Sequence, residues 1–281
     1  MSTAESPVRE FAFTDADFER VRRLIYKRAG ITLSPVKRDM VYSRLARRLR
    51  VTGFTRFAAY LDAMEGGVID EWESFVNALT TNLTSFFREA HHFPTFADHL
   101  RRVADGRQIR VWCCASSTGE EPWSIAMTVL ETLGNDAGRV SIVASDLDTN
   151  VLATAQQGIY PFERVSQLSQ ERLKRFFFRG SGTQEGMVRV RPELQQLVEF
   201  KRINLLDGAW PVASPLDVIF CRNVMIYFDK PTQYRILSRF APMLRAEGLL
   251  FAGHSESFLH AADLFKSLGR TVYALTRTIT S

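Results

Sequence analysis

The chain has 281 residues, 46% of them hydrophobic, which is enough to bury a full core and excludes a chain that is disordered as a whole. No apolar run reaches the roughly 18 residues of a membrane span, and residues 1–7 lack the pattern of a signal peptide, so we expect a cytoplasmic protein. The net charge of +5 is uneven, because residues 20–50 hold eleven Lys or Arg and one Asp, a local charge of +10. Such asymmetry usually marks a surface for an acidic partner.

Residues 15–80 are predicted to form an N-terminal helical domain, preceded by a flexible segment at 1–14. Turn and cap signals divide the domain at Gly30, Ser34, Pro35, Gly53, Gly66 and Gly67. Several short helices are therefore expected.

The second of these helices, at about 36–51, is amphipathic. Its apolar side is formed by Val41, Tyr42, Leu45, Ala46 and Leu49. Its basic side is formed by Lys37, Arg44, Arg47, Arg48 and Arg50. A solvated helix face is one interpretation, but five cations with almost no acidic neighbours exceed what solubility requires. A nucleic acid or an acidic protein helix would each satisfy this surface.

From about residue 108 strands alternate with helices, which favours a mostly parallel sheet covered on both faces. Strands are expected at 109–115, 140–145, 198–203, 216–221 and 248–253, and helices at 122–133, 149–157 and 231–244. Two antiparallel strands are expected within 264–276. The excursion at 159–197 is too long for a simple crossover. Its glycine-rich turn at 180–186, between β-prone runs at 172–178 and 188–191, predicts an inserted small antiparallel β-subdomain.

The loop that follows the first strand indicates the ligand. A strand that runs into a small-residue loop and a helix start is where α/β enzymes hold nucleotide-like ligands. Here the loop has one glycine, Gly119, followed by Glu120 and Glu121, which would repel a diphosphate. The next strand ends at Asp146, where ribose hydroxyls are usually held. An adenosine ligand with a positive charge is therefore favoured, which suggests S-adenosylmethionine.

Cysteine usage gives no sign of a metal. The three cysteines cannot form a disulfide framework, and their spacing is not that of metal ligands. We expect them to be reduced core residues, and we expect no bound metal.

Four segments carry a resemblance to a known family: 80–94 (TTNLTSFFREAHHFP), 117–122 (STGEEP), 145–148 (SDLD) and 221–228 (CRNVMIYF). They resemble the chemotaxis receptor methyltransferases, the CheR family, and the similarity extends from about residue 15 to the C-terminus. The resemblance implies methyl transfer from S-adenosylmethionine to glutamate side chains of chemoreceptors. The products would be γ-glutamyl methyl esters and S-adenosylhomocysteine, for sensory adaptation in bacterial chemotaxis.

The fold implied by the resemblance is α/β. It combines a class I methyltransferase (Rossmann-like), mostly parallel sheet at 108–281 with the N-terminal all-α domain at 15–80. The β-subdomain is inserted at about 159–197, and 81–107 is a linker and helix that contributes to the cofactor site.

Site residues follow from the strand ends and from the resemblance together. Asp146 is expected to bind the ribose, and Glu121 is favoured over Glu120 as a cofactor contact. The complete set of expected cofactor-binding residues is Asn82, Thr84, Arg88, Glu121, Asp146, Asn204, Leu205, Arg222 and Asn223. Thr84 and Arg88 are expected one turn apart on a helix, and Asn204 and Leu205 beside the adenine. Arg88 and Tyr227 are the expected catalytic residues.

Two partner sites are expected. The basic side of the 36–51 helix would dock on an acidic helix of the receptor's cytoplasmic methylation region. The turn containing Gly180, Gly182 and Gly186 resembles the insert by which some family members hold a tethered peptide at the receptor C-terminus. No membrane insertion and no nucleic acid is expected. The alternatives are a methyltransferase of another protein or of nucleic acid, and a non-catalytic signalling adaptor.

Overall fold

The computed structural model describes residues 9–276. Most of the expected flexible segment at 1–14 lies outside these residues. Residues 1–7, where no signal peptide is expected, also lie outside them. The chain forms two compact units, which divide between Thr81 and Asn82. Within the described residues, no helix is both long enough and apolar enough to cross a membrane.

The first unit is helical. It contains α1 (Asp15–Ala29), α2 (Arg38–Thr52), α3 (Phe57–Glu65) and α4 (Trp72–Leu79). A capping box between Thr14 and Asp17 starts α1, and Gly30, at φ 70°, ends it. A single turn of 3₁₀ helix precedes α2, which therefore begins two residues later than predicted. The expected breaks all coincide with helix ends.

The second unit is built on a seven-stranded sheet with the order β6-β2-β1-β7-β8-β10-β9. Its strands are β1 (Ile109–Cys113), β2 (Val140–Asp146), β6 (Val198–Arg202), β7 (Leu216–Cys221), β8 (Leu244–Ala252), β9 (Phe265–Gly269) and β10 (Val272–Leu275). The first five in this order are parallel, and β10 is antiparallel to both of its neighbours. This confirms the predicted mostly parallel sheet.

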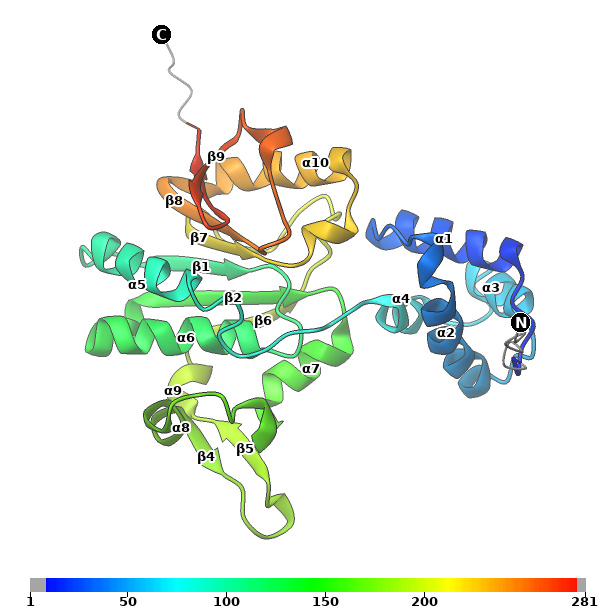
Figure 1. Ribbon diagram of the computed structural model, residues 1–281, viewed down its shortest axis with the longest axis horizontal. Coiled ribbons are helices and arrows are strands. Elements are labelled where there is room, and N and C mark those ends of the chain that lie inside the picture. Colours follow the sequence, from blue (N-terminus) through cyan, green and yellow to red (C-terminus); the bar gives the residue numbers. More distant parts are fainter. Residues whose placement is uncertain (1–8, 277–281) are drawn as a thin grey trace, which may run out of the picture. The chain divides into compact units, whose positions relative to one another are not determined.

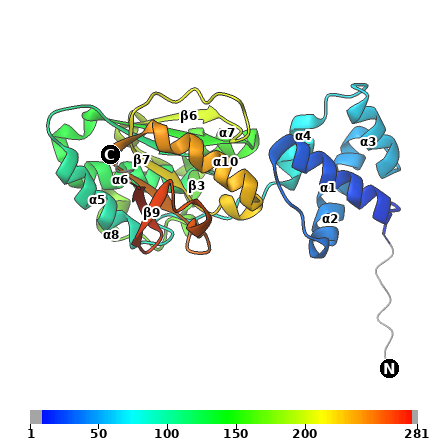
Figure 2. The ribbon, with the colours of Figure 1, turned by 90° about the horizontal axis from the view of Figure 1, so that it is seen from above.

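Alternate side chains of the strands fill two cores. Val111 and Cys113 of β1 pack with α5 (His92–Val103) and α6 (Glu120–Leu133) on one face. Trp112 packs with α10 (Lys230–Phe240) on the other. The helices α5, α6 and α10 are labelled in Figure 2. A further helix, α7 (Thr149–Gln157), follows β2. Because β1 is buried on both sides, its sequence is nearly continuously apolar.

The insertion between α7 and β6 carries a separate three-stranded antiparallel sheet, with the order β3-β5-β4. Its elements are β3 (Ile159–Pro161), α8 (Gln170–Phe176), β4 (Phe177–Arg179), β5 (Met187–Val190) and α9 (Pro192–Gln195). Figure 1 shows the β4–β5 hairpin projecting from the body of the second unit. The expected β-subdomain is confirmed, but the prediction of a β-prone run at 172–178 was wrong for most of its length. Ser169 caps a helix there, and its Oγ accepts from the Arg172 N–H.

Candidate active site

Asp146 lies at the carboxyl end of β2, where its side chain holds the loop that follows β1. Its Oδ2 accepts from the Ser117 N–H at 2.8 Å, and its Oδ1 from the Asp148 N–H at 3.0 Å. Burial raises the pKa of Asp146 to about 6, although these hydrogen bonds oppose the shift. Each oxygen retains acceptor capacity, so the carboxylate can still receive hydroxyl donors.

Only glycine fits at position 119 of the loop, because a side chain there would clash with its neighbours. Its φ is 100°, and a Cβ there would lie 2.7 Å from Tyr160 Oη and 2.9 Å from Ala155 Cβ. The tyrosine hydroxyl is itself fixed, since it donates to the Thr118 carbonyl at 2.6 Å and accepts from Trp123 Nε1 at 2.9 Å. The loop between β1 and α6 is therefore closely packed against the insertion.

The two glutamates that start α6 have different partners. Glu120 is fully buried and pairs with Arg164 of the insertion. Glu121 accepts from Arg222 Nη1 at 2.6 Å and from Cys113 Sγ at 3.3 Å. The carboxylate expected to face the cofactor is thus joined to the residue that follows β7. The helix begins at Glu120, two residues before the predicted start.

The segment around Arg88 is not the predicted helix, and this expectation was wrong. Residues 81–85 have no regular structure, residues 86–91 form turns and bends, and Phe87 and Glu89 each have φ 53°. A left-handed conformation costs a non-glycine residue about 1–3 kcal/mol, so tertiary contacts must maintain it. Thr84 and Arg88 therefore do not share a helical face.

Contacts of this segment place it on the second unit. Asn82 Nδ2 donates to Asp148 Oδ2 at 2.8 Å, and the Asn82 carbonyl accepts from Ser117 Oγ at 2.9 Å. The Thr84 carbonyl accepts from Arg164 Nη2 at 3.4 Å. Arg88 is half-buried, and its Nη1 donates to the Leu83 carbonyl at 2.8 Å. Asn82 is thus brought beside the Asp146 loop.

Arg222 is enclosed by anions. Its side chain is fully buried, and its Nη2 lies 3.4 Å from Glu89 Oε2 while also donating to the Arg88 carbonyl. With Glu121 on the other side, the guanidinium lies between two carboxylates, and one negative charge remains uncompensated. Arg222 would therefore influence a cofactor through Glu89 and Glu121, and its cofactor role stays a prediction.

Asn223 and Tyr227 follow β7. Asn223 has φ 58° and lies against Gly253, where a Cβ would be 2.2 Å from its Nδ2. The buried Glu256 carboxylate accepts from the Asn223 N–H at 3.0 Å. Tyr227 ends a 3₁₀ turn and is partly buried. Both residues lie at the carboxyl edge of the sheet, as expected.

The residues predicted to contact adenine are divided between a turn and the core. Asn204 Oδ1 accepts from the Leu206 N–H at 3.0 Å, which stabilises the turn after β6. Leu205 is 5% exposed and packs in the core on the α10 side of the sheet, together with Trp112. Core packing therefore explains Leu205, and its contact with a base stays a prediction.

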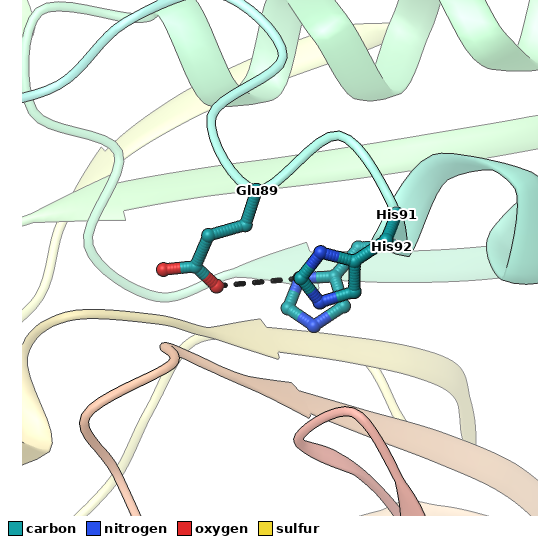
Figure 3. A group of neighbouring side chains, drawn as sticks. All are labelled: Glu89, His91 and His92. Atoms are coloured by element: carbon teal, nitrogen blue, oxygen red, sulfur yellow. Dashed lines mark ion pairs between the residues drawn. The ribbon is translucent and has the colours of Figure 1, made fainter.

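Glu89 and two histidines form a group that sequence reasoning did not assign. Figure 3 shows Glu89 facing His92, with Oε2 and Nδ1 3.7 Å apart, and His91 beside them. Their ligand-type atoms lie within 4.8 Å of one another. Arg222 approaches the same glutamate oxygen, and its charge would oppose a metal ion. We interpret the group as a polar network in which Glu89 pairs with Arg222, while His92 is uncharged near neutral pH because burial lowers its pKa to about 4. Glu89 could not be predicted as a site residue, because it does not lie at the end of a predicted strand.

The basic side of α2 is partly used within the helical unit. Arg48 makes a bidentate pair with the buried Glu71, at 3.0 and 2.6 Å. Arg44 donates to the carbonyls of Ala78 and Thr80. These two side chains stabilise the unit, and their part in docking stays a prediction.

The remaining cations of that side are more available. Arg50 pairs with Glu10, and about half of each side chain is exposed. Lys37 and Arg47 are exposed. The surface that could meet an acidic partner is therefore centred on these three residues.

The glycines of the insertion have distinct roles in its hairpin. A Cβ on Gly180 would lie 2.0 Å from the Gln184 carbonyl oxygen. Gly182 and Gly186 have φ 59° and 80°. The hairpin needs all three for its shape, and nothing in this geometry tests a contact with a peptide.

Two family models together match most of the chain. The model described as "CheR methyltransferase, all-alpha domain" matches residues 16–80, and "CheR methyltransferase, SAM binding domain" matches residues 82–274.

Curated relatives match over nearly their whole length. The "Chemotaxis protein methyltransferase" of Escherichia coli (strain K12) is 55% identical over 95% of this chain and 93% of that protein. "Chemotaxis protein methyltransferase 2" of Pseudomonas aeruginosa is 54% identical over 97% and 99%. The "Probable chemotaxis protein methyltransferase" of Rhizobium etli is 39% identical over 90% and 97%.

Proposed function

Because the chain belongs to the CheR methyltransferase family, we propose that it transfers a methyl group from S-adenosylmethionine to glutamate side chains of chemoreceptors. The products are γ-glutamyl methyl esters and S-adenosylhomocysteine. The reaction takes place in the cytoplasm, on the cytoplasmic methylation region of the receptors.

The observation that carries this proposal is the position of Asp146 beside the one-glycine loop. A buried carboxylate whose pKa is raised to about 6 favours a ligand that brings hydrogen-bond donors to it. Ribose hydroxyls are such donors, and a phosphate is not. Glu121 lies in the first turn of the helix that follows this loop, and it adds negative charge suited to a sulfonium or an ammonium.

The residues present fit S-adenosylmethionine. Asp146 would bind the ribose, Asn204 the adenine and Glu121 the cationic methionine end. Asn82, Thr84 and Arg88 would line the other side of the cofactor. Leu205, Arg222 and Asn223 complete the proposed set, with Arg222 acting through Glu121.

The protein's contribution to the reaction is orientation. S-adenosylmethionine supplies a methyl group activated by its sulfonium. The acceptor glutamate, with a reference pKa of about 4.3, is already ionised near neutral pH, so no general base is required. Arg88 orients the acceptor carboxylate, and Tyr227 lines the methyl end of the site. Proximity and exclusion of water then account for the rate.

Labelled S-adenosylmethionine and cytoplasmic receptor fragments test the proposal. Base-labile label on the receptor would identify the methyl ester. Transfer to nucleic acid, or cofactor binding without transfer to any receptor fragment, would contradict it. Arg88→Ala should lower turnover. An Arg88→Ala variant with normal cofactor binding and full turnover would show that both roles assigned to this residue are wrong.

The receptor's acidic helices would meet the exposed cations of α2. Lys37, Arg47 and Arg50 are the accessible members of the proposed surface, while Arg44 and Arg48 support it from within. Charge complementarity of this kind raises association rates and fixes register more than it raises affinity.

The small sheet would hold a receptor C-terminal peptide. Because β5 lies between β3 and β4, these two are the edge strands of that sheet. A peptide could pair with such an edge and raise the local concentration of substrate. Exposed Phe178 of β4 would offer an apolar contact. Deletion of 181–185, within the turn formed by Gly180, Gly182 and Gly186, should weaken receptor binding; unchanged binding would exclude this role.

A further inference from the structure

The Glu89 carboxylate connects three segments of the candidate site. Its Oε1 accepts from the His254 N–H at 3.1 Å and from Asn223 Nδ2 at 3.3 Å, and it lies 3.0 Å from His254 Nδ1. Its Oε2 lies 3.4 Å from Arg222 Nη2. The same oxygen lies 3.7 Å from His92 Nδ1, and Figure 3 shows these two side chains facing each other. One side chain therefore joins the ends of β7 and β8 to the start of α5.

Arg88 lies between the two left-handed residues of this turn. On one side, the Phe87 N–H donates to Ser124 Oγ at 2.9 Å, and the Arg172 guanidinium lies 3.9 Å from the Phe87 ring centroid. On the other side, Glu89 supplies the contacts described above. A backbone of this kind persists only where the surroundings over-determine it. On the side of β7 and β8, Glu89 anchors the turn together with Arg222, whose Nη2 donates to the Arg88 carbonyl.

We propose that Glu89 is a positioning residue for methyl transfer, whose carboxylate holds the 87–89 turn on the ends of β7 and β8 and so fixes Arg88 and Asn223 relative to each other. The inference rests on the proposed function, because Arg88 and Asn223 are themselves proposed to contact the cofactor or the acceptor. Glu89 acts through them. Misplacing a positioned group by about 1 Å can lower a rate about 100-fold.

Substitution by glutamine is a sharp test because Glu89 is ionised in the native protein. Burial raises its pKa, but hydrogen bonds from His254 and Asn223 and the charge of Arg222 outweigh burial and hold the pKa at about 2. Glu89→Gln keeps the size of the side chain, removes its charge and replaces one acceptor by a donor.

Two measurements on the full chain are decisive. Glu89→Gln should lower kcat for a receptor fragment about 100-fold, with a smaller change in cofactor affinity, because Asp146 and its loop are unaltered. Hydrogen exchange of the amides at 86–90 should become faster. Glu171→Gln, on the exposed surface of α8, is the matched control and should change neither. A kcat within about twofold of the unaltered chain, or unchanged exchange, would overturn the proposal.

Milder variants decide the matter if Glu89→Gln does not fold. His254→Ala removes the imidazole contact but leaves the backbone N–H and Arg222 in place. Glu89→Asp keeps the charge and shortens its reach. Both should show intermediate losses in kcat and faster exchange at 86–90, and normal values in both would reject the role. Absence of methyl transfer by the unaltered chain would instead contradict the proposed function, and the exchange measurement would still test the anchor.

Discussion

Arg222 Nη1 lies 2.6 Å from Glu121 Oε2, and both side chains are buried beneath the carboxyl edge of the sheet. The pair joins the first turn of α6 to the residue after β7. Two of the segments expected to form the cofactor site are thereby held together before any ligand binds. Breaking the pair should therefore affect stability as well as binding.

Removal of one partner leaves an unpaired buried charge, which typically costs about 3–5 kcal/mol. We expect Arg222→Met to lower the free energy of unfolding by that amount, and Glu121→Gln to lower it less, because Arg222 keeps Glu89 as a partner. The double variant should lose less than the sum. Urea unfolding followed by tryptophan fluorescence would report mainly on the second unit, which contains Trp112, Trp123 and Trp210, whereas the first unit contains Trp72 alone. Additive losses in the double variant would show that the two side chains are not coupled.

The raised pKa of Asp146 predicts two pH effects of opposite sign. Cofactor affinity should fall as the pH drops below about 6, because the protonated carboxyl loses acceptor capacity. The ligand-free fold behaves differently, because a raised native pKa stabilises it only while the group is protonated. That contribution, about 3 kcal/mol, is complete below about pH 3.8 and is lost as the pH rises through about 6.

Calorimetry between pH 5 and 7 would measure the affinity, and urea unfolding the stability. Asp146→Asn is the reference, because it lacks the titration. Its affinity should be low and nearly independent of pH in this range. If the pH dependence of the two proteins were the same, another group would be responsible.

Much of the fold could be predicted because apolar runs in the second unit are bounded by turn residues. The strand at 216–221 and the helix at 149–157 have the predicted bounds. Both are determined by local signals: an apolar run interrupted only by Asp217 in the first, and the Asp148 cap and Gly158 stop in the second. The position of Asp146 could be predicted for the same reason, because it is the last residue of a strand.

The turn at 87–89 could not be predicted, because distant contacts determine it. The spacing of Thr84 and Arg88 favours a helix, but Glu89 binds residues more than 130 positions away, and these contacts stabilise left-handed backbone instead. Tertiary packing likewise determined the place of Leu205. The helix α8 is a different case, since Ser169 offered a cap signal that was not used.

Gly119→Ala should disable the loop after β1. The new Cβ would meet the Tyr160 hydroxyl and the Ala155 side chain at under 3 Å, and φ 100° is unfavourable for alanine. We expect loss of about 2 kcal/mol or more in unfolding free energy and a large loss of cofactor affinity. Gly138→Ala, which meets nothing within 4 Å, is the matched control. Normal cofactor binding by Gly119→Ala would mean that this loop does not form the site.

Charge reversal on α2 should separate receptor docking from folding. Arg47→Glu and Lys37→Glu alter exposed cations, so each should raise the KM for a receptor fragment about fivefold, corresponding to about 1 kcal/mol, and leave cofactor affinity unchanged. The loss should shrink at high salt, because exposed charges are screened. Arg48→Glu should instead destabilise the helical unit, since it leaves Glu71 buried without its partner.

The control for these variants is Arg56→Glu, an exposed cation of the same unit that lies outside both α2 and the 3₁₀ turn with Lys37 that precedes it. It should leave receptor kinetics unchanged. Melting curves would identify the variants that remain folded, and initial methylation rates at two salt concentrations would then be compared among them. An equal increase in KM for Arg56→Glu and Arg47→Glu would indicate a general charge effect. Docking on the exposed side of α2 should not depend on a cation elsewhere in the unit.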